Sequence, residues 1–243
     1  MLRTLTTFCA VVAAAVIFSQ HPARAAELTT KEVLDQKGDG PDGQGNTADD
    51  TWQFWLQLVH NKKYIPLDTF STTVPKEGVK RKISGPIAKD LPNPTDTVGW
   101  IYHSDWDGCF EGVWGDSKAN QVIAYPYVEK GVHCAVAVTY KIPEDGKYTI
   151  SGEVTDIHVW EHPKHDGFNW IVELVEGKNG DNLVKELGKG GPFGDGGGRE
   201  AGGKIELKDV EAKKGQMIRL VIHPGKWWGS DMTKIENFKV EKQ

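Results

Sequence analysis

Apolar and polar residues alternate along several short stretches of this chain, as they do in half-buried β-strands. The stretch "WQFWLQLV" places Trp52 and Phe54 on one side of an extended strand, with Gln53 and Gln57 on the other. The stretch "VHCAVAVTYK" that begins at Val132 alternates in the same way. Further strand candidates are "FNWIVELV", "KIELKDV", "QMIRLVI" and "IENFKV", each bounded by Gly, Pro or Asp.

One of these stretches breaks its own alternation. In "KYTISGEVTDIHVW", Tyr148, Ile150 and Val154 alternate, but Ile157 and Val159 are out of phase with them. One extra residue near Thr155 or Asp156 would restore the phase, which is what a β-bulge supplies. The pattern therefore predicts a bulge near these two residues.

The pattern as a whole predicts an all-β fold. About nine or ten short strands without alternating helices are typical of antiparallel sheets packed face to face, as in a β-sandwich or jelly roll. Helical periodicity is confined to a turn or two near Thr29 to Gln36. We expect one sandwich domain over residues 51–243, preceded at 26–50 by a linker or irregular cap rich in turn formers.

Three stretches of the C-terminal half resemble a known family. "YTISGEV", "KKGQMIRLVIHP" and "SDMTKIENFKV" follow one another in the order of strands and turns seen in the closing half of galactose-binding-like jelly rolls. These domains serve as carbohydrate-binding modules, and the resemblance covers roughly residues 120–243. It implies a β-sandwich that binds glycans through one rim, in some cases with a structural calcium, and it transfers no ligand residue by position.

The first 25 residues have the order of a secretory signal peptide. Arg3 precedes an apolar run from Phe8 to Phe18, and the small-residue motif Ala23-Arg24-Ala25 precedes Ala26. The run is shorter than the roughly 20 apolar residues of a membrane span. We therefore expect a secreted or periplasmic protein without a membrane span, and we expect it to be a monomer.

Charge argues against a nucleic-acid partner. The formal net charge is −5, and the predicted leader carries two arginines and no acid, so the mature chain is more acidic still. Its arginines are Arg81, Arg199 and Arg219, and its lysines are scattered among carboxylates. No basic stripe that could neutralise a phosphate backbone is visible in the sequence.

Cysteine usage fits an oxidising compartment. Cys9 leaves with the predicted leader, and Cys109 and Cys134 remain as an even pair. We expect them to form a disulfide, although two independent buried thiols would also fit.

The nine tryptophans carry the main functional signal. Trp52 and Trp170 are in phase with aliphatic neighbours and are expected in the core, whereas Trp114 fits either core or rim. Trp106 lies between two aspartates in a turn, where burial would desolvate both carboxylates. Exposed indoles beside acids suit sugars, because the ring covers the C–H face of a pyranose while the acids accept its hydroxyl hydrogens. We predict a glycan-binding rim of Trp106, Asp105, Asp107, His103, Glu111, Trp160, His162, His165, Asp166, Trp227 and Trp228.

The same residues are also compatible with an enzyme. Paired carboxylates about 5 to 9 Å apart could catalyse glycoside hydrolysis, and a polysaccharide lyase would need a base such as His103 or Tyr102. Asp107 and Glu111 complete the catalytic alternative. No Gly-x-Ser-x-Gly motif is present. A structural envelope or matrix protein, whose aromatic rings merely pack, is the third alternative.

Two stretches of the sequence contain residue types that bind metal ions. His162, His165 and Asp166 could meet if Pro163 folds the chain back, but we favour a polar rim loop there. "GDGPDGQGNTADD" fails the EF-hand order. A looser calcium site there would draw on Asp39, Asp42, Asp49 and Asp50, with a solvated linker as the alternative. The glycine-dense stretch 188–203 lacks the context of a phosphate loop and is expected to be a long flexible loop.

Overall fold

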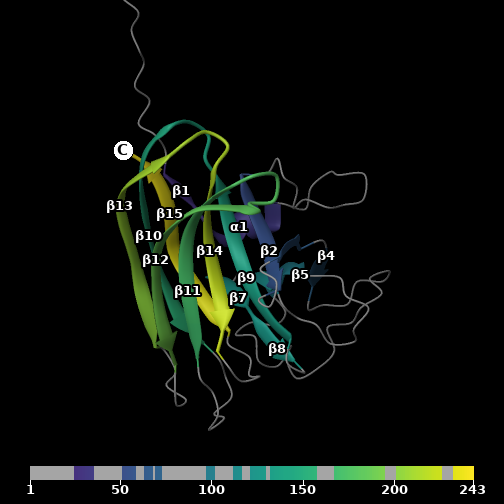
Figure 1. The fold of residues 1–243 in the computed structure, drawn as a ribbon. Coiled ribbons are helices and arrows are strands. Elements are labelled where there is room, and N and C mark those ends of the chain that lie inside the picture. The colour runs from purple at the N-terminus through teal and green to yellow at the C-terminus, as the bar shows by residue number, and fades with distance from the viewer. Residues whose placement is uncertain are drawn as a thin grey trace, which may run out of the picture.

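The chain folds into two antiparallel β-sheets packed face to face (Figure 1). This computed structural model describes residues 25–35, 51–58, 63–67, 69–72, 97–101, 112–116, 121–129, 132–157, 167–194, 201–225 and 232–243. The predicted all-β sandwich is confirmed. The chain changes sheet repeatedly, for example from β9 to β10 and from β14 to β15, as in a jelly roll.

Sheet A has eight strands, in the order β13-β10-β15-β7-β6-β5-β4, with β1 pairing to β15. Its strands are β1 (Ala26–Glu27), β4 (Thr69–Thr72), β5 (Thr97–Ile101), β6 (Gly112–Asp116), β7 (Gln121–Tyr125), β10 (Gly146–Asp156), β13 (Gly202–Ala212) and β15 (Thr233–Lys242).

Sheet B has seven strands, in the order β12-β11-β14-β9-β2-β3, with β8 pairing to β9. Its strands are β2 (Trp52–Leu58), β3 (Lys63–Pro66), β8 (Tyr127–Glu129), β9 (Val132–Lys141), β11 (Phe168–Glu176), β12 (Asn182–Phe193) and β14 (Met217–Pro224). The described strands outnumber the nine or ten expected. The reason is that β1, β3, β4 and β8 span only two to four residues, too few to show an alternation in sequence.

The core lies between the sheets and follows the predicted alternation. Trp52, Phe54 and Leu56 of β2 point inward, and so do Val136 and Val138 of β9. Trp114 and Trp170 are buried as well. The core expectation for Trp52 and Trp170 is confirmed, whereas Trp114 is buried but lies outside this cluster, because its neighbour Val113 is the inward residue of β6.

The predicted bulge near Thr155 or Asp156 is wrong. Strand β10 keeps one alternation to its end, and its last inward position is Asp156, which is fully buried. The register instead shifts against both partner strands, with the extra residue in β13 and in β15, where Asp209 and Asn237 have positive φ angles of 55° and 51°. The sequence looked out of phase because a carboxylate occupies an inward position.

The N-terminal described segment packs onto sheet A. The six-residue helix α1 (Thr30–Asp35) follows Thr29, whose amide donates to Glu32 Oε2 at 3.1 Å and whose hydroxyl contacts the same oxygen, as in a capping box. Leu28 and Val33 are buried, and the Leu28 amide donates to the Phe238 carbonyl at 2.8 Å. Residues 26–35 are therefore part of the sandwich.

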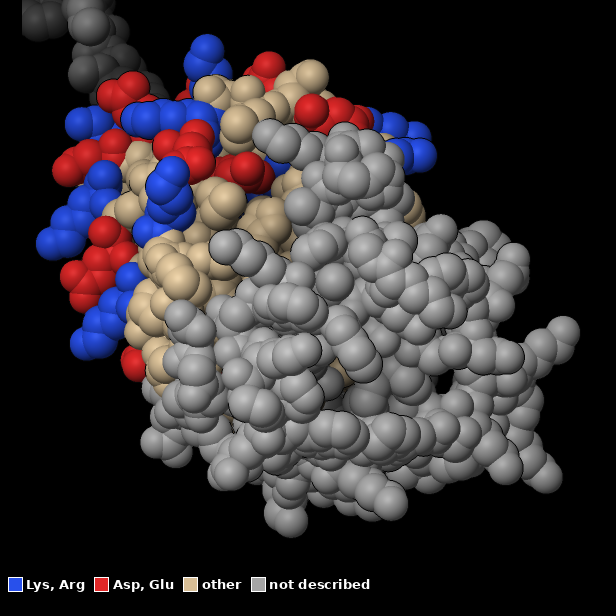
Figure 2. Space-filling view, turned by 60° about the horizontal axis from the view of Figure 1, so that its bottom comes forward, with Lys and Arg blue, Asp and Glu red and all other residues tan. Residues whose placement is uncertain are grey.

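One end of the sandwich is closed by three short turns, at 142–145, 177–181 and 213–216, and we call it the turn end. The C-terminal residues of β15 lie at this end, next to the start of β10 (Figure 1). Acidic and basic residues are interspersed over the described part of the surface in Figure 2, in agreement with the scattered charges of the sequence. In the part of the chain that the structure describes, no helix has the length and apolar character needed to cross a membrane.

Candidate functional site

All eleven residues of the predicted rim lie outside the described residues, in the segments 102–111, 158–166 and 226–231. The strand ends that flank these segments are described, and they show where each segment leaves the sandwich. We call these described flanking residues the frame of the candidate site.

In sheet A, strand ends that flank the three segments lie close to one another. Ile101, before the first segment, pairs with Gly112, after it. Gly112 pairs with Tyr125 of β7, and the adjacent Ala124 pairs with Thr233, which follows the third segment. In β10, Asp156 pairs with the same Thr233, shortly before the second segment. Because neighbouring strands are about 4.8 Å apart, the span from β6 to β10 is about 15 Å.

In sheet B the same end is framed by Phe168 and Pro224, which pair with each other. Phe168 follows the segment 158–166, and Pro224 precedes 226–231. The residues that flank each of these segments therefore lie in different sheets, which pack about 10 Å apart. We call this end of the sandwich the loop end; it is the end opposite to the turn end, and it also receives the segment 195–200, between β12 and β13.

Four residues of the frame are fully buried. Asp156, Phe168, Met232 and Thr233 all have 0% exposure. They cannot contact a ligand themselves. The frame brings the flanking strand ends of the three predicted rim segments together, and the segments contain aromatic rings, imidazoles and carboxylates, which are groups that bind hydroxylated ligands.

The glycine-dense stretch is a strand for much of its length, so the expectation of a long flexible loop over 188–203 is wrong. Residues 188–193 belong to β12, and Gly202 and Gly203 begin β13. A Cβ at Gly190 or Gly203 would lie 2.6 Å from the ring of Trp170 or Phe193, respectively. The glycines make room for two aromatic rings where β12 and β13 meet.

A second polar region, on the outer face of sheet B, was missed by the sequence analysis. A small cluster of buried apolar side chains lies on this face: Trp55, Tyr64, Ala135, Ala137 and Val221. Among them are four polar side chains with exposures of only 1% to 6%, namely Gln53, Gln57, Thr139 and Arg219. Gln57 Oε1 and Thr139 Oγ1 have no hydrogen-bond partner within the described part of the chain.

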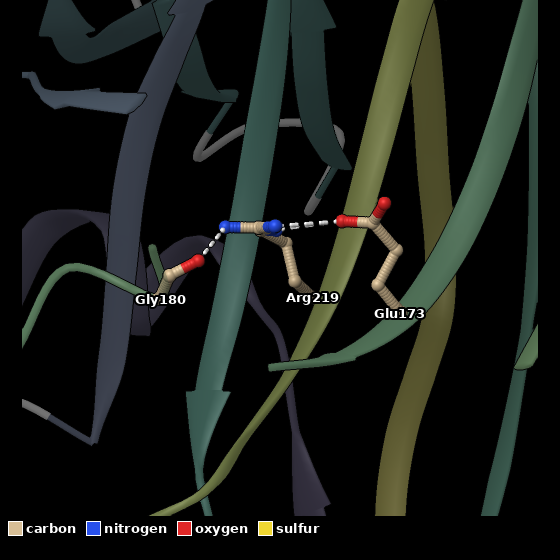
Figure 3. A network of polar contacts seen from close by, with 3 residues as sticks. All are labelled: Glu173, Gly180 and Arg219. Carbon is tan, nitrogen blue, oxygen red and sulfur yellow. Dashed lines mark hydrogen bonds and ion pairs between the residues drawn. The ribbon is translucent and has the colours of Figure 1, made fainter. Parts of the chain in front are cut away.

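Arg219 organises this face, with Gly180 and Glu173 on either side of it (Figure 3). Its Nη2 lies 2.8 Å from Glu173 Oε2, and its Nη1 donates to the Gly180 carbonyl at 2.9 Å. The guanidinium stacks over the ring of Tyr64, 3.5 Å from the centroid. Burial raises the pKa of Tyr64 above its ordinary value, Glu173 raises it further, and Arg219 partly opposes them.

The signal for this second region was present in the sequence. Trp55 is in phase with Gln53 and Gln57, so an indole had to lie on the polar side of β2. Because the side chains of this face are buried, it is not an open ligand surface. The contacts of Arg219 fasten the turn 177–181 to sheet B.

The remaining predicted site residues stay predictions. Cys134 is buried in β9, but its expected partner Cys109 lies outside the described residues. The same holds for the calcium candidates Asp39, Asp42, Asp49 and Asp50. Within the ranges that the structure describes, no group of three or more His, Cys, Asp or Glu could hold a metal ion.

Comparison with solved structures finds carbohydrate-binding modules. The chain is similar to TmCBM61, solved in complex with β-1,4-galactotriose (11% identity, 56% of this chain and 74% of that chain, TM-score 0.32). It is also similar to a family 29 carbohydrate-binding module (14%, 54% and 74%, TM-score 0.33). A third is a cleaved adhesin domain of Lys-gingipain from Porphyromonas gingivalis (13%, 59% and 81%, TM-score 0.35).

Neither the scan against protein-family models nor the search of curated proteins gives a match. Carbohydrate-binding modules are thus among the structures that this chain is similar to, as the resemblance of its C-terminal strands predicted.

Proposed function

We propose that this chain is an exported carbohydrate-binding protein that recognises a polysaccharide or cell-surface glycan through aromatic and acidic residues at its loop end. One observation carries the proposal. The strand ends that flank the predicted rim segments lie at one end of sheet A, in β5, β6, β15 and β10, with only β7 between β6 and β15.

The convergence matters because a glycan needs several contacts at once. An indole covers only one face of one sugar ring, and the polar groups must reach the hydroxyls of the same or the next ring. Trp106, Trp160 and Trp228 belong to three different segments, and side chains so far apart in sequence can act together only if their segments start from one end. The described frame meets this requirement.

The proposal is tested by glycan-array and affinity-gel binding with purified mature protein. The panel includes β-1,4-galactotriose, xylopentaose and intact plant and bacterial polysaccharides. We expect wild type to bind at least one glycan, and Trp106→Ala and Trp228→Ala to weaken that binding at least about tenfold, as for a central aromatic contact. Both variants should keep the far-ultraviolet spectrum of the sandwich.

The matched control is Leu183→Ala. Leu183 is 58% exposed on β12 and pairs with Val175, near the turn end, so the substitution removes exposed apolar surface away from the rim. It should leave binding unchanged. Equal binding by all the variants, or no glycan bound by wild type, would reject the proposal. Release of reducing ends or unsaturated uronates, lost in Asp107→Asn or His103→Ala, would replace it with the enzyme alternative.

A further inference from the structure

The end of β10 joins the roots of three connecting segments. The amide of Asp156 donates to the carbonyl of Ala201, and the amide of Ile157 donates to the carbonyl of Met232, both at 2.8 Å. Ala201 closely follows the segment 195–200, Met232 follows 226–231, and Ile157 precedes 158–166. Backbone hydrogen bonds of two consecutive residues therefore join the roots of three segments.

The carboxylate of Asp156 is unusual at an inward-facing position of a strand. Asp156 has 0% exposure and occupies the inward row of β10, whose other members include Tyr148, Ile150 and Val154. A buried carboxylate is tolerated only where hydrogen-bond donors or a cation meet it. An apolar residue of similar size would fill an inward position at less cost. The packing of the core does not explain an aspartate here.

Two neighbours share this environment. Thr233, also at 0% exposure, pairs with Asp156 across the β10–β15 ladder, and directly paired residues point to the same face of a sheet. Gly202 lies on the other side of β10, and a Cβ there would collide with the carbonyl oxygen of Val154. The backbone that leaves the segment 195–200 is thus pressed directly against β10, with no side chain between.

We infer that Asp156, with Thr233 opposite it, is a positioning residue that fixes the roots of the segments 158–166, 195–200 and 226–231 relative to one another. Its consequence for glycan recognition rests on the proposed function. The carboxylate is buried and does not touch a ligand. It acts on the described roots of the segments that carry the rim tryptophans and histidines, by fixing the positions from which these segments start.

Amide hydrogen exchange tests this without any ligand. Asp156→Asn keeps the shape of the side chain and removes its charge. We expect the amides of Ile157 and of the strand starts at Gly202 and Thr233 to exchange about tenfold faster or more, the size expected for one lost charge-assisted hydrogen bond. The amide of Gly215, which donates to Ile142 at the turn end, should keep its wild-type rate.

The matched control is Glu153→Gln, which removes a carboxylate from an exposed position of the same strand and should change none of these rates. A merely structural role for Asp156 would speed exchange equally at both ends, because the whole sandwich would open more often. Uniform acceleration, or no change in a folded Asp156→Asn protein, overturns the inference. If Asp156→Asn does not fold, Thr233→Val is judged by the same local pattern.

Glycan affinity is the second readout, measured with the best binder of the glycan array. Asp156→Asn should weaken binding about tenfold, while Glu153→Gln should not. Unchanged affinity in the presence of locally faster exchange contradicts the proposed consequence for recognition. If wild type binds no glycan, the proposed function fails, and the exchange pattern alone decides the role of Asp156.

Discussion

The two ends of the sandwich are built from different residues. At the turn end, short turns bond to one another: the Gly215 amide donates to the Ile142 carbonyl at 2.9 Å, and the Lys214 amide donates to Asp145 Oδ1 at 2.7 Å. The Tyr148 hydroxyl donates to the Glu144 carbonyl at 2.7 Å. Gly177, Gly180 and Gly215 have positive φ angles there. These residues make tight reversals of the chain.

The segments that leave the loop end carry tryptophan and histidine beside their aspartates, and these side chains suit sugar binding. Binding residues are commonly found on connections that a rigid scaffold positions. The difference fits the proposal that the turn end stabilises the fold and the loop end carries recognition. Substitutions at the turn end should therefore lower stability and spare binding.

The largest effect on stability is expected for Arg219→Ala. It leaves Glu173 partly buried without its partner and frees the turn 177–181, so the free energy of unfolding should fall by about 3 kcal/mol. Chemical denaturation measures this. Replacing both Arg219 and Glu173 by Met should cost less than Arg219→Ala. Glycan affinity of the folded protein should not change, and a loss of affinity would break the contrast between the ends.

The next largest effect is expected for Gly190→Ala, in β12 on the way to the loop end. Its Cβ would lie 2.6 Å from the indole of Trp170, and forcing the two apart should cost about 1 to 3 kcal/mol. A double-mutant cycle with Trp170→Leu checks the cause, since the smaller side chain should relieve most of the cost. Equal costs in both backgrounds would show that this glycine has no packing role.

Alkaline pH should destabilise the fold through Tyr64. Burial raises its pKa above the ordinary value of 10.0, so above pH 10 the unfolded chain loses this proton while the folded chain keeps it. The contribution of Tyr64 to the free energy of unfolding is constant at neutral pH. It then falls by at most about 1.4 kcal/mol per pH unit as the pH rises beyond 10. Denaturation at pH 8 to 11 should show that the free energy of unfolding falls less steeply with pH in Tyr64→Phe than in wild type. An identical slope in the two proteins contradicts the account.

The smallest effect is expected at the Lys242–Glu144 ion pair of the turn end. Its atoms are 3.0 Å apart, but the glutamate side chain is 59% exposed. Exposed pairs contribute little, so Lys242→Gln should change the unfolding free energy by less than about 0.5 kcal/mol. Thermal denaturation in low and high salt measures this, and a large salt-dependent loss would be contrary to expectation.

The sequence predicts the sandwich because alternation is a local property. Trp52, Phe54 and Val136 point inward as their spacing indicates. Prediction from alternation fails where the type of residue is unusual for its position in the fold. Asp156 is inward although it is charged, and this produced a false bulge. Gly190 belongs to a strand although glycine favours loops, because the ring it accommodates lies on another strand.

The sequence proposes residues for the candidate site but does not predict how the ends of their segments are arranged. Trp106 and Trp228 stand out in the sequence because acids or turn formers flank them. Whether their segments share one end depends on strand order, which pairs β15 with both β7 and β10. Such pairings join residues that are far apart in the chain, such as Ala124 and Thr233, or Asp156 and Thr233, and no local pattern encodes them. The outer-face contacts of Arg219 were missed for the same reason.

Mapping glycan contacts onto the two ends tests the central claim most directly. Backbone amide shifts are followed by NMR as the best binder of the array is added to wild type. Shifts should concentrate at the roots of the connecting segments, including Tyr125, Ile157 and His223, and leave Gly180 and Gly215 unmoved. Shifts centred on the turn end, or spread evenly over both ends, would contradict the assignment of glycan recognition to the loop end.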